Sequence, residues 1–81
     1  MNSDISRGQE LCAMAVKLYE EHNGMHSRND VLALEKAIKY LDEASSLFVD
    51  LPDNVEAKHM PKKFIASINE LLQHGRARLG M

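Results

Sequence analysis

Apolar residues recur every three to four positions along most of the chain, and strict alternation of apolar and polar residues is not sustained over more than a few positions. The first spacing places apolar side chains on one face of an α-helix, whereas alternation is typical of a half-buried strand. The pattern predicts helices over about 5–22, about 28–50 and about 61–79. Because short polar segments separate them, we expect an all-α fold, an antiparallel three-helix bundle with short loops, in one domain over residues 1–81.

Short-range signals mark the helix ends. Ser27 followed by Asp30 three positions later is typical of a helix start. Asn23 and Gly24 offer the left-handed residue that commonly ends the helix before them, and Gly80 has the same role after the last helix.

Two prolines set the boundaries of the last helix. Pro52 stops the helix over 28–50, because proline donates no backbone hydrogen bond and restricts the residue before it. Pro61 has two interpretations. Either it opens the last helix at its first position, with a separate helical turn over 54–59, or it kinks a helix that begins near Asn54.

The predicted helices differ in how much of their circumference is apolar. On the helix over 61–79 the apolar residues share an arc of roughly 120°, which is one core-facing stripe. On the helices over 5–22 and 28–50 they cover roughly 200° each. A three-helix bundle has one interior and needs only one helix with such a broad arc, so we expect apolar surface to remain exposed after folding. The alternative is a loose stripe on the first helix, diluted by Ala and Met.

The excess apolar surface predicts a contact with another molecule, either as a homodimer seam or as a groove for another protein, and small bundles often need such a contact for stability. The candidate partner-binding residues are Leu11, Met14 and Leu18. The residues expected in the core are Leu34, Ile38, Leu41, Phe48, Phe64, Ile68, Leu71 and Leu72.

Composition argues against catalysis. A chain of 81 residues, 44% hydrophobic and 27% charged, supports one thin core and no cofactor-sized enzyme. The single cysteine, Cys12, excludes an intrachain disulfide, and its place among apolar residues of a helix predicts a buried, inert thiol. The glycines are scattered singly, so no phosphate-binding loop is present. We expect no catalytic residues and no small-molecule substrate.

Four histidines raise the question of a metal site. Glu56 and His59 have the three-residue spacing of carboxylate-bridged sites in helix bundles, but such a site needs a second pair and two further carboxylates. Glu70 and His74 project away from the apolar arc of their helix. We therefore expect solvated or capping histidines, with no metal and no cofactor. The apolar stretches near the start are too short for a secretory or membrane segment, so we expect a cytoplasmic protein with no membrane contact.

Charge is unevenly distributed around a net of −2. Residues 1–57 carry a formal charge of −6 and residues 58–81 one of +4. A basic last helix suggests contacts with an anionic partner, nucleic acid included. The residues that would make them are Lys58, Lys62, Lys63, Arg76 and Arg78. They scatter around the helix instead of forming one stripe, so nucleic acid is the alternative partner and not the favoured one.

One segment resembles a known repeat. The sequence AIKYLDEA over 37–44, followed by LPDN over 51–54, is similar to the second helix of a tetratricopeptide repeat, with Ala37 and Ala44 at the close-packing positions. The proline comes three residues later than in that repeat, and the preceding helix lacks its Trp, Leu-Gly and Tyr pattern. The length and three-helix layout are also similar to microtubule-interacting-and-trafficking modules. We assign the chain to neither family.

These observations favour a non-catalytic protein–protein interaction domain, such as an adaptor, a chaperone-like subunit or an inhibitor of a larger assembly. We expect it to self-associate through the spare apolar face of the helix over 5–22. The alternative is a small nucleic-acid-associated regulator that uses the basic last helix.

Overall fold

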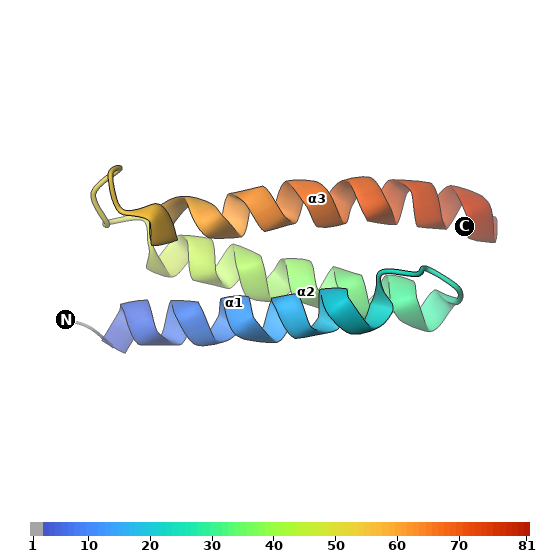
Figure 1. The fold of residues 1–81 in the computed structure, drawn as a ribbon, viewed down its shortest axis with the longest axis horizontal. Helices are drawn as coiled ribbons and strands as arrows, with labels where there is room; N and C mark the ends of the chain where they lie inside the picture. The colour runs from blue at the N-terminus through green and yellow to red at the C-terminus, as the bar shows by residue number, and fades with distance from the viewer. Residues whose placement is uncertain (1–2) are drawn as a thin grey trace.

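A computed structural model describes residues 3–81, which form the helices α1 (Ser3–His22), α2 (Arg28–Leu47) and α3 (Glu56–Leu79). Successive helices run in opposite directions, so α1 and α3 are parallel to each other (Figure 1). The described chain measures 44 × 18 × 15 Å, the shape of a short rod. The predicted all-α, antiparallel three-helix bundle is confirmed.

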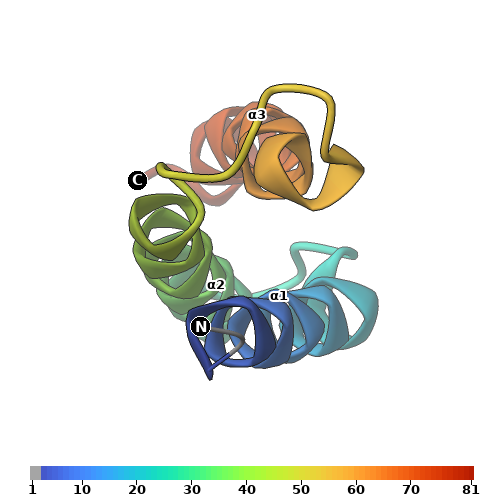
Figure 2. The same ribbon diagram turned by 90° about the vertical axis from the view of Figure 1, so that its left-hand side faces the viewer.

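Helix α2 is the central element. It packs against α1 along one side and against α3 along another, whereas α1 and α3 touch each other very little. Viewed along the rod, α1 and α3 lie on different sides of α2 (Figure 2). The broad apolar arc predicted for the second helix is explained by this position, because two neighbours require two apolar stripes.

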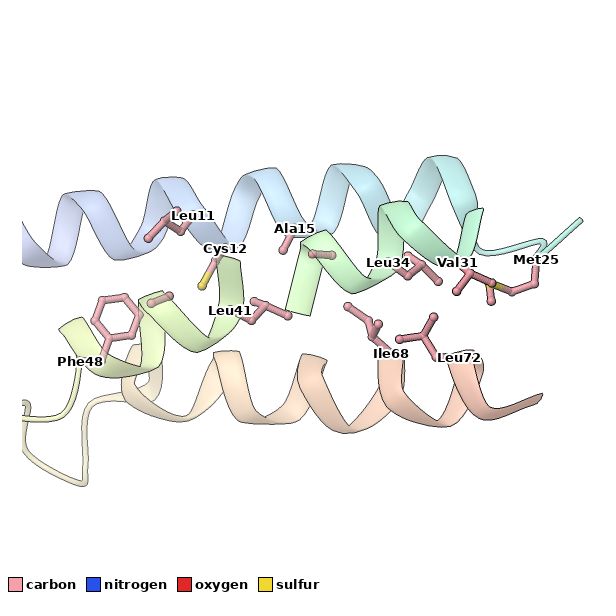
Figure 3. Packing of buried hydrophobic residues seen from close by; sticks show 12 residues of the cluster. Leu11, Cys12, Ala15, Met25, Val31, Leu34, Leu41, Phe48, Ile68 and Leu72 are labelled. Carbon is pink, nitrogen blue, oxygen red and sulfur yellow. The ribbon is translucent and has the colours of Figure 1, made fainter. Parts of the chain in front are cut away.

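The core runs along the rod between the helices, and the α1–α2 connection contributes to it (Figure 3). Among the predicted core residues, Ile38, Phe64 and Leu71 are only partly buried and pack against its edge. The other five are buried together with residues from α1 and the connection. The buried hydrophobic residues are Leu11, Cys12, Ala15, Met25, Val31, Leu34, Ala37, Leu41, Ala44, Phe48, Ile68 and Leu72.

Two glycines allow bulky side chains to lie against helix backbones. A Cβ atom on Gly8 would be 2.3 Å from Cε1 of Phe48, so the ring packs directly on the α1 backbone. A Cβ atom on Gly75 would be 2.2 Å from Cε of Met25, so Met25 packs in the same way on α3. Phe48 and Met25 both lie outside the helices, one after α2 and one before it. Each end of the rod is therefore filled by a side chain from a connection.

The helix start at Arg28 follows the sequence prediction. The Asp30 carboxylate accepts hydrogen bonds from the backbone N–H groups of His26, at 2.7 Å, and Ser27, at 3.3 Å. Such bonds satisfy donors that a helix start leaves free. Gly80 ends α3 in the left-handed conformation, with φ 74°, as predicted.

One prediction about the α1–α2 connection is wrong. The left-handed residue after α1 is Met25, with φ 51°, and not Gly24. This conformation costs more for methionine than for glycine. In this conformation the Met25 side chain is buried against Gly75, and that burial offsets the cost.

Two helix ends also differ from the prediction. Helix α2 ends at Leu47 instead of about 50, because the chain turns at Phe48 and Leu51, whose N–H groups bond to the carbonyls of Ala44 and Phe48. Helix α3 begins at Glu56 instead of about 61 and contains Pro61. Of the two interpretations of Pro61, the helix that begins before the proline is the one observed.

Candidate functional site

The predicted contact residues of α1 do not share one surface. Leu11 has no exposed area because it packs in the core, and its assignment to an exposed face is wrong. Met14 is 38% exposed and Leu18 is half-buried against the core. These two residues line a shallow hollow between α1 and α2, where Tyr40 also lies. The hollow is rimmed by charged side chains, those of Lys17, Glu21 and Lys36.

The more apolar hollow lies on the neighbouring side of α1, between α1 and α3, and Lys17 lines both hollows. This α1–α3 groove has a volume of about 440 Å³. Its apolar lining comes from α1, from the start of α3 and from Phe48. The lining residues are Gln9, Cys12, Ala13, Val16, Lys17, Glu20, Phe48, Ala57, Met60 and Phe64.

Residue spacing explains why α1 lines this groove. The residues of α1 that line the groove are separated alternately by three positions and by one position, from Gln9 to Glu20. This spacing places them on one face of a helix. Leu11 and Ala15 lie beside that face and are buried. The broad apolar arc of α1 is thus divided: one part closes the core, and a second part, with Cys12 and Val16, faces the groove.

Met60 is the large apolar side chain at the edge of the groove. It is 40% exposed, almost the same fraction as Met14, which lines the hollow between α1 and α2. The polar lining residues, Gln9, Lys17 and Glu20, all come from α1. The wall formed by α3 is therefore apolar, and the wall formed by α1 carries the charged rim.

Cys12 lies in the groove wall as a protonated thiol. Its side chain points from α1 toward the side on which α3 lies (Figure 3). It is 8% exposed, and burial raises the pKa of the thiol. A raised pKa lowers the fraction of the reactive thiolate at neutral pH. The sequence prediction of a buried cysteine is confirmed.

At the other end of the rod, the α1–α2 connection lies against α3. One nitrogen of Arg78, Nη2, donates hydrogen bonds to the carbonyl oxygens of Gly24, at 2.7 Å, and Met25, at 2.5 Å. The His22 ring nitrogen Nδ1 lies 2.7 Å from Oδ1 of Asp30, which joins the end of α1 to the start of α2. The hydrogen bond with His22, with smaller contributions from backbone N–H groups, lowers the pKa of the Asp30 carboxyl.

The five basic residues of α3 are not brought together. Arg76 pairs with Glu35 of α2, and Arg78 binds the connection carbonyls described above. Lys58 Nζ lies 2.8 Å from Oδ1 of Asp53. This contact and the nearby positive charges lower the pKa of the Asp53 carboxyl.

Of the two remaining basic residues, one lies beside the Lys58–Asp53 pair. Lys62 lines a hollow that also contains Lys58 and Asp53, while Lys63 is exposed. Binding of an anionic partner by the five basic residues stays a prediction, and three of them already have intramolecular partners.

The histidines make local contacts. His59 Nε2 lies 2.6 Å from the carbonyl oxygen of Asp53, which it reaches as a donor, and His22 contacts Asp30. Within residues 3–81, no three side chains of His, Cys, Asp or Glu are grouped so that they could hold a metal ion. Over the same range, each helix is too short or too polar to cross a membrane.

The groove between α1 and α3 was missed by sequence reasoning for two reasons. Periodicity gives the width of an apolar arc but not the neighbour that each part of the arc meets. In addition, Ala57 and Met60 lie before residue 61, the predicted start of the last helix, so the apolar arc predicted for that helix does not include them. Comparison of the chain with protein-family models, curated proteins and solved structures found no match.

Proposed function

We propose that the chain is a non-catalytic protein–protein interaction domain that binds an amphipathic helix of a partner protein in the α1–α3 groove. The observation that supports this most strongly is the groove itself, whose floor and α3 wall are apolar and whose two sides are parallel helices. Apolar grooves between helices commonly receive the apolar face of another helix. A bound helix would complete a four-helix arrangement around Phe48.

The dimensions suit one helical segment. The α1 lining extends from Gln9 to Glu20, which corresponds to about 16 Å, or three helical turns, at the rise of an α-helix. The rod is 44 Å long, so the groove occupies only part of its length. A standard stable interface buries roughly 800 Å² on each partner, more than such a short groove offers to a flat surface. A partner helix is therefore the favoured occupant, and a second copy of the chain is the competing one.

The rim indicates what such a helix would carry beside its apolar face. Lys17 and Glu20 lie at the groove on α1, whereas Met60 and Phe64 form the opposite wall. A partner helix with an acidic residue near Lys17, a basic residue near Glu20 and apolar residues toward α3 would match both sides. Exposed pairs of this kind mainly set orientation, and the apolar contacts supply most of the affinity.

Two methionines of nearly equal exposure provide a matched test. Helical peptides of about 14 residues, the length needed to cover three turns, are selected from a display library on the wild-type chain, and the tightest peptide is synthesised. Its affinity is then measured for the Met60→Asp and Met14→Asp variants. We expect Met60→Asp to weaken binding by at least about 30-fold, because it places a charge on the apolar α3 wall, and Met14→Asp to change it by less than about three-fold. Circular dichroism checks that both variants fold.

The reverse result would place the binding site in the hollow between α1 and α2. Loss of binding in Met14→Asp alone would assign the function to the hollow of Met14 and Leu18. Sedimentation velocity over a range of concentrations tests self-association in the same samples. A dimer that Met60→Asp abolishes would make a second copy the occupant of the groove, and the partner-helix proposal would then be wrong.

A further inference from the structure

The α3 wall of the groove consists of two parts on either side of Pro61. Ala57 and Met60 belong to the first turn and a half of α3, before the proline, and Phe64 follows it. The later part of α3 is held by buried Ile68 and Leu72 and by Arg78. No side chain of the segment Glu56–Met60 is fully buried. Its side-chain hydrogen bonds, unlike those of Arg78, do not lead to another helix or to the α1–α2 connection.

The backbone of this first segment lacks a usual helix-stabilising contact at each of its ends, and the Pro61 ring that follows it is buried. The residue before it, Val55, has an extended N-cap conformation but makes no side-chain hydrogen bond to the free N–H groups of the helix start. Pro61 has no N–H group, so the carbonyl of Ala57 lacks its usual partner four residues on. A following proline also disfavours the helical conformation of Met60.

The side-chain hydrogen bonds of the segment lead to one exposed residue in the α2–α3 connection, Asp53. Lys58 Nζ binds the Asp53 carboxylate at 2.8 Å, and the His59 ring contacts the Asp53 carbonyl at 2.6 Å. The Asp53 side chain is 89% exposed. Ion pairs in such positions contribute little to stability, so this tether opens easily.

From these contacts we infer that Glu56–Met60 is a hinged wall of the α1–α3 groove, which opens at Pro61 while the rest of α3 stays packed. Opening moves Ala57 and Met60 away from Cys12 and Phe48 and widens the groove, so that occupants of different bulk fit. The inference concerns the free chain and does not depend on the identity of a partner.

Cys12 and two backbone amides report the opening. Cys12 lies in the groove opposite this segment, so its reaction with a small thiol reagent measures how often the wall is open. The amides of Lys62 and Lys63 have helical acceptors at Lys58 and His59, so their hydrogen exchange measures the same event. Both rates should be insensitive to low urea concentrations, because local opening exposes little surface.

Two valine substitutions separate this motion from global unfolding. Val55→Thr keeps the size of the side chain and adds an N-cap hydroxyl, so we expect both rates to fall about five-fold. The control is Val49→Thr, which makes the same change at a valine that is 65% exposed and caps no helix, and it should alter neither rate. In the opposite direction, Asp53→Ala removes the carboxylate that binds Lys58 but keeps the carbonyl that His59 contacts, and it should raise both rates about two-fold.

Three results would overturn the inference. In the first, Val55→Thr and Val49→Thr affect the two rates equally. In the second, both rates rise with the first additions of urea, as global unfolding predicts. In the third, Asp53→Ala leaves both rates unchanged although a urea titration shows the variant folded.

Discussion

The same pair of helices, α1 and α3, is connected differently at the two ends of the rod. At the end that contains the α1–α2 connection, Met25 packs on Gly75, and Arg78 binds two carbonyls of the connection, so α1 and α3 are bridged. At the end that contains the α2–α3 connection, Phe48 packs on Gly8 of α1, and the groove remains between Phe48 and the start of α3. We call these the bridged end and the open end.

The difference arises from how each connection contacts the third helix. The α1–α2 connection reaches across to α3, the helix that it does not join, and so ties all three helices together. The α2–α3 connection bulges outward beside the start of α3 (Figure 1), and its Asp53 binds only residues of that helix. A hydrogen-bonded link to the third helix is therefore present at one end of the rod, and the groove lies at the other end, where the α2–α3 connection reaches α1 with the Phe48 ring.

The largest expected effect concerns the two side chains that fill the ends. Replacement of Phe48 by Ala should lower the free energy of unfolding by about 3–5 kcal/mol, and replacement of Met25 by Ala by about 2–3 kcal/mol, because each leaves a cavity in the core. Urea unfolding measures both. Only Phe48→Ala should also speed thiol labelling of Cys12 under native conditions, since Phe48 shares the groove with Cys12. Equal acceleration by Met25→Ala would show that the ends are not independent.

The two glycines should respond unequally to alanine. At Gly8 the added Cβ meets the rigid ring of Phe48, and overpacking of about 1–3 kcal/mol exceeds the gain in helix propensity of about 1 kcal/mol. At Gly75 it meets the flexible end of Met25, which can move aside, so the loss should be smaller. Thermal or urea unfolding of Gly8→Ala and Gly75→Ala compares them. A larger loss at Gly75 would mean that Met25 is the more tightly held of the two side chains.

Loss of the Arg78 contact should loosen the bridged end alone. Arg78→Gln removes the hydrogen bonds to Gly24 and Met25, and because the side chain is exposed we expect a loss of only about 0.5–1 kcal/mol. Hydrogen exchange should accelerate at residues 24–27 and stay unchanged at Lys62. Lys63→Gln, a neutralised exposed residue of the same helix, is the control. Equal acceleration at both ends would contradict a local bridge.

The smallest expected effect is on acid stability. The pKa of Asp30 at the bridged end and that of Asp53 at the open end are both lowered, so each carboxylate stabilises the fold above its unfolded pKa. This stability is lost as the pH falls below about 4, through the lowered folded pKa. Because Asp30 is less exposed than Asp53, Asp30→Asn should flatten the acid dependence more than Asp53→Asn. Unfolding curves at pH 7 and pH 3 compare them.

The three helices could be predicted because they follow from local periodicity. The start of α2 could also be predicted, since Ser27 and Asp30 meet within one turn. The start of α3 could not, because Val55 is a poor cap and Pro61 is itself typical of a helix start.

The candidate site was harder to predict than the fold. An excess of apolar surface on α1 was expected, but Leu11 was assigned to it and proved to be buried. A helical-wheel projection of the sequence does not show which part of the broad apolar arc of α1 packs against α2, since that depends on how the two helices cross. Met25 shows the same limit: a methionine in a polar connection carries no local signal that it will enter the core between α2 and α3.

The contact of Arg78 with residues 24–25 also has a consequence for how the chain matures on the ribosome. A nascent chain that has released only α1 and α2 has no acceptor site for the Met25 side chain, since Gly75 has not yet been made. The turn between the first two helices therefore takes its final shape after more than fifty later residues have been added. The α1–α2 connection is thus translated early but reaches its final conformation late in folding.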